Sequence, residues 1–314
     1  MSVERESPWG LMAVADAHVH FFSHGFFSAL AAQKREVTRE VTPESAPELT
    51  IEAIGEQLGW HMPGAEPQQL AAAWVHELDR HGVARAGLIA SVPGDEASVA
   101  AAARAHPDRF FAYSMVDPVR GWNPDGLEEI DVACLFPAMH RYPIQSEEAR
   151  HVFEWASRKG RAVLVHCGVL SVGVRKKLGL ESRFDMRFSN PIDLHAVALE
   201  FASVPIIIPH FGAGYFREAL MVADLCPNVY LDTSSSNQWM RYQESHLDLR
   251  QVFRRALDVV GPKRLLFGTD SSFFPRGWHH QIFDAQATAL YELGLSEDDA
   301  RSIFQENLLR ILAR

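Results

Sequence analysis

Two histidines separated by one residue stand in the stretch Val14-Ala15-Asp16-Ala17-His18-Val19-His20. Successive side chains of a strand point to opposite faces, so His18 and His20 would share one face with Asp16. Two imidazoles in this arrangement can bind one divalent ion at about 2.0 to 2.1 Å. A strand end with two hydrogen-bonded histidines and no metal explains the stretch equally well. The choice between the two depends on the rest of the chain.

Three more apolar runs are followed by a side chain of the same chemical kind. His166 ends the run VLVH, His210 follows IIIP, and Asp270 follows LLFGT. Imidazole and carboxylate groups are the ligands that suit Zn²⁺ and similar divalent ions. Packing of apolar strands does not require polar residues at their ends. The repeated occurrence of histidine and aspartate at strand ends therefore predicts a metal site formed by these ends.

The apolar runs that would position these side chains alternate with helical patterns. The first run ends at His20, and the others span residues 86–90, 109–116, 131–136, 162–166, 205–210, 228–233 and 264–267. Two helical patterns, residues 281–292 and 296–312, close the chain. Eight nearly continuous apolar strands alternating with helices predict the α/β class and a (β/α)8 TIM barrel, whose catalytic residues gather at the C-terminal strand ends. An open doubly wound sheet is the alternative, but no GxGxxG or GxxxxGKS loop follows any strand.

The connection after the first strand is unusually long. Residues 21–80 contain no clear strand, whereas residues 50–58 and 67–81 have helical spacing of apolar residues. Connections of this length are usually functional, so we expect a helical insertion that acts as a lid at the barrel mouth. The 314 residues are expected to form one domain, 1–314, because barrels of this size commonly do.

Composition limits the partners of the protein. Lys and Arg number 30 against 40 Asp and Glu, the net charge is -10, and no basic run occurs, which argues against nucleic acid. No apolar run approaches the roughly 18 residues of a membrane helix, so we expect a soluble, cytoplasmic protein with no membrane partner. Cys134, Cys167 and Cys226 are isolated, which argues against a disulfide framework and a thiolate zinc site. A homo-oligomer is left open.

Several of these motifs occur together in one known family. In chain order they are Asp16-Ala17-His18-Val19-His20, His166, His210-Phe211-Gly212-Ala213-Gly214 and Gly268-Thr269-Asp270, followed by the ending at residues 306–312. With them the sequence resembles the metal-dependent amidohydrolase superfamily. It is most similar to the amidohydrolase-related branch, which includes aminocarboxymuconate semialdehyde decarboxylase and related nonoxidative decarboxylases.

The resemblance implies a role for each matching residue. His18, His20, His166 and Asp270 would hold the metal, Asp270 would also take a proton from the bound water, and His210 would be the general acid/base. Many two-metal members carry a bridging lysine on the fourth strand, but that strand reads Cys134-Leu135-Phe136-Pro137 here. We therefore expect one divalent metal ion, with Zn²⁺ the best candidate.

The substrate is expected to be a small molecule that carries a carboxylate. Arg183 and Arg187 after the fifth strand and Arg141 after the fourth could bind it bidentately, although loop arginines are more often solvated. Trp278, after the eighth strand, could line the pocket. The first reaction to consider is hydrolysis, in which metal-activated water attacks an amide, ester or lactone carbonyl.

Two other readings remain open beside hydrolysis. One is nonoxidative decarboxylation of an aromatic or muconate-like acid, toward which the stretch His-Phe-Gly-Ala-Gly-Tyr-Phe-Arg after the sixth strand leans. The other is a catalytically silent binding barrel, which the full ligand set disfavours. Release of carbon dioxide would separate decarboxylation from hydrolysis, and turnover of any substrate would exclude the silent barrel.

Overall fold

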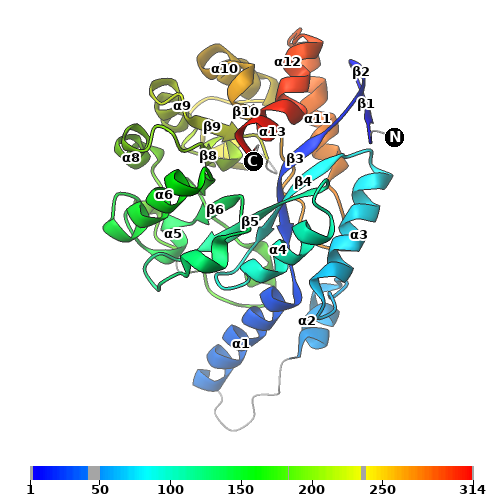
Figure 1. The fold of residues 1–314 in the computed structure, drawn as a ribbon, viewed down its shortest axis with the longest axis vertical. Coiled ribbons are helices and arrows are strands. Elements are labelled where there is room, and N and C mark those ends of the chain that lie inside the picture. The colour runs from blue at the N-terminus through cyan, green and yellow to red at the C-terminus, as the bar shows by residue number, and fades with distance from the viewer. Residues whose placement is uncertain (1–2, 42–49, 183, 235–237, 313–314) are drawn as a thin grey trace.

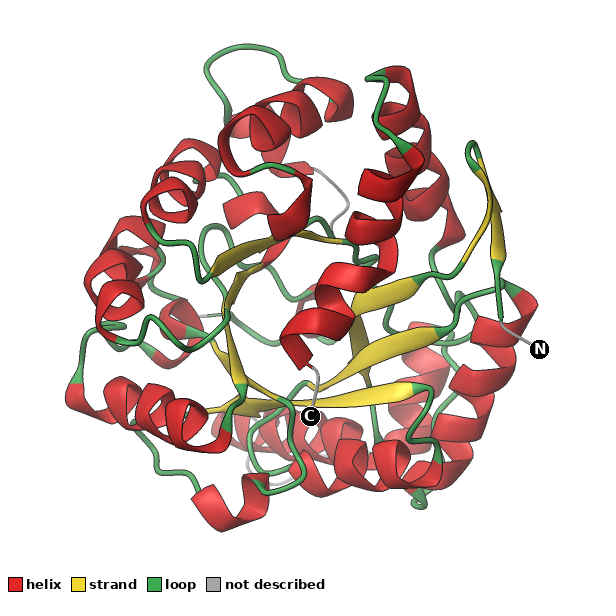
Figure 2. Ribbon diagram, turned by 45° about the horizontal axis from the view of Figure 1, so that its top comes forward, coloured by secondary structure: helices red, strands yellow, loops and turns green. Residues whose placement is uncertain are grey.

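The barrel is one parallel sheet ringed by helices (Figure 1, Figure 2). The computed structural model describes residues 3–41, 50–182, 184–234 and 238–312. Its eight parallel strands are hydrogen-bonded in chain order. They are β3 (Ala15–Phe21), β4 (Arg85–Ala90), β5 (Phe110–Val116), β6 (Val132–Leu135), β7 (Ala162–Val165), β8 (Ile206–Ile208), β9 (Val229–Asp232) and β10 (Leu265–Leu266). The predicted TIM barrel is therefore confirmed, with each strand inside its predicted run or within one residue of it.

The barrel closes between its first and last strands through backbone contacts. The amide of Ala17 donates to the carbonyl of Phe267 at 2.8 Å, and the amide of Asp270 donates to the carbonyl of His18 at 3.0 Å. A further bond joins the amide of His20 to the carbonyl of Ser271 at 2.7 Å. This seam brings the first predicted ligand motif into register with the last.

Helices connect consecutive strands, and three more follow the last strand in the described part of the chain. The helices are α1 (His24–Val41), α2 (Ile51–Leu58), α3 (Pro67–Arg80), α4 (Glu96–Ala105), α5 (Pro137–His140), α6 (Glu147–Lys159), α7 (Gly173–Lys177), α8 (His195–Glu200), α9 (Phe216–Leu225), α10 (Leu249–Val260), α11 (His280–Glu292), α12 (Glu297–Arg301) and α13 (Asn307–Leu312). The single helix predicted for residues 296–312 is interrupted by a π-helical turn at Ser302–Glu306. None of the helices among the described residues is long and apolar enough to cross a membrane.

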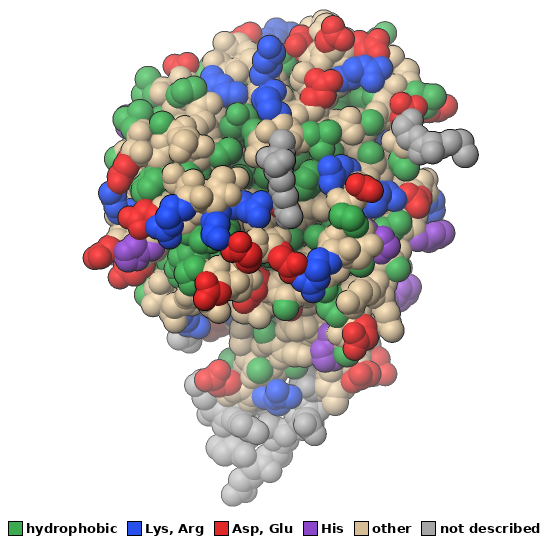
Figure 3. All heavy atoms as spheres, viewed as in Figure 1, with side chains coloured by type: hydrophobic (Ala, Val, Ile, Leu, Met, Phe, Trp, Pro, Cys, Tyr) green, Lys and Arg blue, Asp and Glu red, His purple; other side chains and the backbone are tan. Residues whose placement is uncertain are grey.

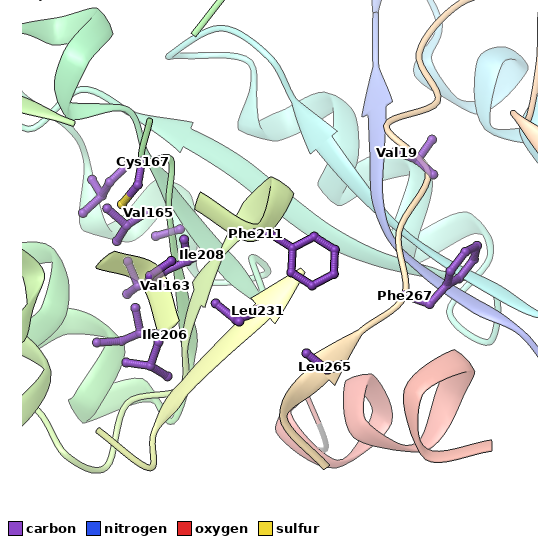
Figure 4. Packing of buried hydrophobic residues seen from close by; sticks show 14 of the residues in the cluster. Val19, Val163, Val165, Cys167, Ile206, Ile208, Phe211, Leu231, Leu265 and Phe267 are labelled. Carbon is purple, nitrogen blue, oxygen red and sulfur yellow. The ribbon is translucent and has the colours of Figure 1, made fainter. Parts of the chain in front are cut away.

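Two apolar layers hold the barrel. Outward-facing side chains such as Val163, Ile206 and Leu231 pack between the sheet and the helices, as Figure 4 shows for part of this layer. Inward-facing side chains such as Leu164 and Ile207 fill the barrel, where Leu308 of α13 joins them. The continuous apolar runs of the strands are explained by burial on both faces.

The long connection after β3 divides into two parts. Helices α1 and α2 project from one end of the barrel (Figure 1), whereas α3 packs beside α4 in the ring. Phe26, Leu30 and Ile54 of the projecting pair pack against Val174 and Leu178 of the segment after β7. The predicted helical insertion is therefore present, and it packs against the segment after β7 at the barrel mouth.

Helix α1 and an N-terminal hairpin were among the elements not predicted from the sequence. A short antiparallel hairpin, β1 (Arg5–Ser7) and β2 (Gly10–Met12), precedes the barrel. Its strands are three residues long and half exposed, so they carry no usable alternation of apolar residues. On the face seen in Figure 3, acidic and basic side chains are interspersed, in keeping with the absence of a basic run in the sequence.

Candidate metal centre

A cavity of about 1550 Å³ opens at the C-terminal ends of the strands. His18, His20, His166, His210 and Asp270 all line it. The five residues that the sequence analysis selected from four different strand ends therefore face one space. Side chains of α1 and of the segment after β7 complete its outer wall.

Three of these side chains converge most closely. His18, His20 and Asp270 each offer one ligand atom, and these atoms lie within 4.8 Å of one another. Nε2 of His20 is 3.2 Å from Oδ1 of Asp270, and Nε2 of His18 is 3.9 Å from the same oxygen. His18 is almost fully buried, whereas His20 and Asp270 are partly exposed to the cavity.

Hydrogen bonds on the far side of each ring determine which nitrogen carries the proton. Nδ1 of His18 lies 2.6 Å from Oδ2 of the buried Asp232, a carboxylate that can only accept. Nδ1 of His20 lies 2.7 Å from Oγ of Ser91, and that hydroxyl already donates to the carbonyl of Ile89 at 3.1 Å. Both Nδ1 atoms therefore donate, and in the neutral rings both Nε2 atoms present a lone pair toward Asp270.

This arrangement fits a cation. Two imidazole lone pairs and a carboxylate oxygen are all acceptors, and acceptors at these distances repel unless a positive charge lies between them. Imidazole nitrogen and carboxylate oxygen are also the donors that Zn²⁺ and similar ions take. Oriented Nδ1 donors are the usual support for metal-binding histidines. The residues present fit the divalent ion that the sequence predicted.

The charges of this group follow from its surroundings. Burial opposes protonation of His18, but the Asp232 carboxylate outweighs it and raises the pKa of His18. Burial would likewise raise the pKa of Asp270, but His20 and the other histidines hold it below its usual value. Asp270 is therefore a carboxylate at neutral pH.

His166 adds a fourth donor beside this group. Its ring is buried, with its centroid 5.3 Å from that of His210, and its Nδ1 has no hydrogen-bond partner among the described residues. Burial, together with His210 and His18, holds the pKa of His166 well below its usual range, so the ring is neutral. A neutral imidazole with an unsatisfied buried nitrogen suits a metal ligand.

His210 stands beside the group and has a fixed tautomer. Its Nδ1 donates to the carbonyl oxygen of Ser234 at 2.7 Å, which leaves the Nε2 lone pair free. The ring centroid lies 4.9 Å from that of His18. Burial and the neighbouring His18 lower the pKa of His210, so the ring is neutral and able to accept a proton.

A buried carboxylate ties the two ligand motifs together. Asp16 accepts from the amides of His18 and Thr269 at 2.9 and 3.1 Å, and from the Thr269 hydroxyl at 2.5 Å. Nε1 of Trp278 donates to it at 2.8 Å. Burial raises the pKa of Asp16 to about 6 in spite of these donors. Asp16 therefore points away from the metal group and fixes the seam instead.

Trp278 does not occupy its predicted place. Its side chain is buried behind Asp16 and does not line the cavity. The apolar environment explains this position, because the indole packs against Phe267 and Phe283 and uses its N–H on Asp16. This geometry does not favour a contact between Trp278 and a substrate. Trp278 instead stabilises the site through its hydrogen bond to Asp16.

Backbone geometry also marks the strand ends. His210, Asp270 and Arg141 all have positive φ, at 58, 60 and 60°. Residues other than glycine seldom adopt this region, and strain of this kind persists where the surrounding structure imposes it, often at functional sites. Gly268 makes a related contribution. A Cβ there would lie 2.7 Å from Oδ1 of Asp232 and 3.0 Å from Cβ of His18.

The predicted substrate arginines fall in different places. Arg141 lines the cavity. Arg187 is outside the lining and largely exposed, and its Nη2 is paired with Oδ2 of Asp185 at 2.6 Å, so the geometry does not favour a substrate contact. Arg183 lies outside the described residues.

Other residues of the site were not found from the sequence. Asp232 was included only as part of the predicted strand 228–233, and Ser91, Ser234 and Arg276 belonged to no motif. Asp232, Ser91 and Ser234 act through histidines distant in the chain, as Asp232 does through His18, 214 positions away. Arg276 instead depends on contacts within its own loop. A carboxylate as the last residue of an apolar strand was the one signal that could have singled out Asp232.

Comparisons with known proteins agree with this geometry. The family model described as Amidohydrolase matches residues 15–314. Among curated proteins, the chain is 35% identical over 89 residues to Protein fluG of Emericella nidulans. That match covers 28% of this chain and spans only 10% of the length of the relative.

Solved structures share the whole fold at low sequence identity. A 5-carboxyvanillate decarboxylase from Novosphingobium aromaticivorans, complexed with manganese and 4-hydroxy-3-methoxy-5-nitrobenzoic acid, is 13% identical with a TM-score of 0.61 over 100% of both chains. A probable 2-pyrone-4,6-dicarboxylic acid hydrolase from Acinetobacter baumannii, with citric acid bound, is 14% identical with a TM-score of 0.60 over 96% of this chain and 100% of that chain. At these identities the likeness shows the fold.

Proposed function

The chain belongs to the amidohydrolase family, and we propose that this enzyme is a metal-dependent hydrolase with one divalent ion held by His18, His20, His166 and Asp270. The observation that carries the proposal is the convergence of Nε2 of His18 and Nε2 of His20 on Oδ1 of Asp270. Zn²⁺ is the ion that this donor set suits best. A divalent ion in such a site lowers the pKa of bound water and polarises a carbonyl oxygen.

The protein itself supplies the proton transfers. The Asp270 carboxylate faces the ligand group and can accept a proton there. His210 holds its own proton on Nδ1 against the Ser234 carbonyl, so its Nε2 can take a proton from a nucleophile and later return it to a leaving group. Hydrolysis begins with deprotonation of water, and a neutral histidine that first accepts a proton suits this step.

The cavity also indicates the charge of the substrate. Among the described residues, its lining includes six cationic residues, Arg120, Arg141, Arg175, Lys177, Arg241 and Arg276, against the four acidic residues Glu36, Asp117, Glu181 and Asp270. Guanidinium groups bind carboxylates with high geometric specificity. We therefore propose a small substrate with a carboxylate and a hydrolysable amide, ester or lactone carbonyl, with Arg141 as one candidate contact.

Decarboxylation is the second candidate, and one observation favours it. The ring of Phe22 lies 5.6 Å from that of His20, so an aromatic surface begins directly beside the ligand group. Such a surface suits a flat aromatic acid whose carboxylate is at the metal. The Novosphingobium aromaticivorans structure is named as a decarboxylase of this kind of acid.

Product analysis on metal-loaded enzyme tests both candidates. The substrates would be carboxylated lactones, esters and amides, together with hydroxylated benzoates, with His210→Ala as the inactive control. Release of a new acid without carbon dioxide, lost in His210→Ala, is the expected result. Carbon dioxide released in proportion to product would replace hydrolysis with decarboxylation, and turnover of neither group of compounds would contradict the proposed function.

A further inference from the structure

A row of stacked aromatic rings runs along one wall of the cavity from the ligand group to the mouth. Phe22 follows β3, Trp60 lies between α2 and α3, and Phe273 follows β10. The Trp60 and Phe273 rings are 3.9 Å apart and nearly parallel, at 10°, and Trp60 and Phe22 are 6.2 Å apart at 17°. We call Phe22, Trp60 and Phe273 the aromatic row. All three line the cavity.

Two cations flank the outer part of the aromatic row. Nζ of Lys177 lies 5.2 Å from the Trp60 ring centroid, and Cζ of Arg276 lies 4.6 Å from the Phe273 centroid. Both side chains line the cavity, and they come from different parts of the chain, Lys177 from the end of helix α7 and Arg276 from the segment after β10. Cations above aromatic faces are held there without losing their charge.

Hydrogen bonds to uncharged groups also orient the Arg276 guanidinium. Its Nη2 donates to Oγ of Ser272 at 2.9 Å and to the backbone carbonyl of Asp270 at 3.2 Å. Within residues 3–41, 50–182, 184–234 and 238–312, no ion pair joins Arg276 or Lys177 to a carboxylate. Most of the guanidinium donors are therefore available to a ligand, because the two bonds use one nitrogen.

We propose that Arg276 and Lys177 form a second anion subsite, which selects a planar substrate with two anionic groups. This inference rests on the proposed function for the position of the reacting group at His18, His20 and Asp270. The flat body of the substrate lies along the aromatic row, and its second carboxylate meets the Arg276 guanidinium and the Lys177 ammonium. The bond from Arg276 to the Asp270 carbonyl keeps this subsite at a fixed distance from the metal ligands.

A purely structural role of Arg276 makes a different prediction. If the residue only braced the loop after β10, its loss would weaken all ligands alike or release the metal from Asp270. A subsite for a second carboxylate affects only ligands that carry one. The ratio of affinities for a dianion and a matched monoanion separates the two roles.

The experiment is calorimetric titration of the metal-loaded enzyme with isophthalate and with benzoate, neither of which has a hydrolysable bond. The wild-type enzyme should bind isophthalate at least about 10-fold more tightly than benzoate, which is about 1.4 kcal/mol. Arg276→Gln should lose most of this preference, and Arg276→Lys should recover part of it. Arg217→Gln is the control and should keep the preference, because Arg217 is largely exposed, pairs with Glu218 and does not line the cavity.

Three results would overturn the subsite. They are an absence of preference for isophthalate in the wild type, a preference that survives in Arg276→Gln, and a loss of bound metal in Arg276→Gln. Because the probes do not react, the test is independent of the reaction type. Failure of the proposed hydrolase activity would leave the binding preference intact, and failure of the subsite would leave hydrolysis intact.

Discussion

Replacing Asp232 by asparagine should weaken metal binding without touching a metal ligand. Asp232 is fully buried, Oδ2 accepts from Nδ1 of His18 at 2.6 Å, and Oδ1 accepts from the amide of Ser234 at 2.6 Å. Asparagine has nearly the same shape but only one acceptor oxygen. If that oxygen stays with Ser234, the new amide nitrogen faces His18 and donates to its Nδ1. The proton of His18 then moves to Nε2, where the lone pair is needed for the metal.

The expected magnitude follows from the bond that is lost. A hydrogen bond to a charged group contributes about 1.5 to 3 kcal/mol. This one is short and wholly buried, which places it in the strong, charge-assisted class. At about 1.4 kcal/mol for each factor of ten, metal affinity should fall about 10- to 100-fold, the range usual for residues that orient metal-binding histidines.

The assay is competition for Zn²⁺ against a chromophoric chelator at neutral pH. Asp284→Asn is the matched control, since that carboxylate is half-exposed and paired with Arg5 far from the cavity. It should bind metal as the wild type does. Metal affinity of Asp232→Asn within twofold of the wild type, in a protein with unchanged circular dichroism, would refute the role given to Asp232.

Two other substitutions test the same geometry. Gly268→Ala should lower both metal affinity and the melting temperature, because the added Cβ would lie 2.7 Å from Oδ1 of Asp232. Gly173→Ala should change neither, because no atom lies within 4 Å of its added Cβ. Equal effects of the two variants in metal titration and thermal denaturation would show that crowding at Gly268 is not the cause. His210→Ala should keep its metal and lose about 100-fold or more in kcat, whereas His18→Ala should lose metal and activity together; elemental analysis showing His210→Ala as empty as His18→Ala would make His210 a ligand.

The fold could be predicted from the sequence because each barrel strand is an apolar run buried on both faces. The ligand candidates could be found for a related reason, since polar residues such as His166 and Asp270 stand out where such runs end. The N-terminal hairpin could not be found, because three-residue strands that are half exposed leave no periodic pattern.

The remaining residues of the site could not be assigned from the sequence, because some depend on contacts that the closed barrel creates and others on the conformation of a single loop. Trp278 looked like a rim residue, but the seam places it behind Asp16, 262 positions away in the chain. Arg276 lacked any local motif, and its importance comes from Phe273 and the carbonyl of Asp270. Arg187 had the right residue type in the right loop, but Asp185, two residues away, pairs with it.

Anomalous X-ray diffraction from crystals grown with Zn²⁺ or Mn²⁺ tests the metal centre most directly. We expect one anomalous peak per chain, at about 2.0 to 2.2 Å from Nε2 of His18, Nε2 of His20 and Oδ1 of Asp270, with His166 in the same coordination sphere. Two peaks in the cavity would contradict a single ion. A peak elsewhere, or none at saturating metal, would contradict the site itself.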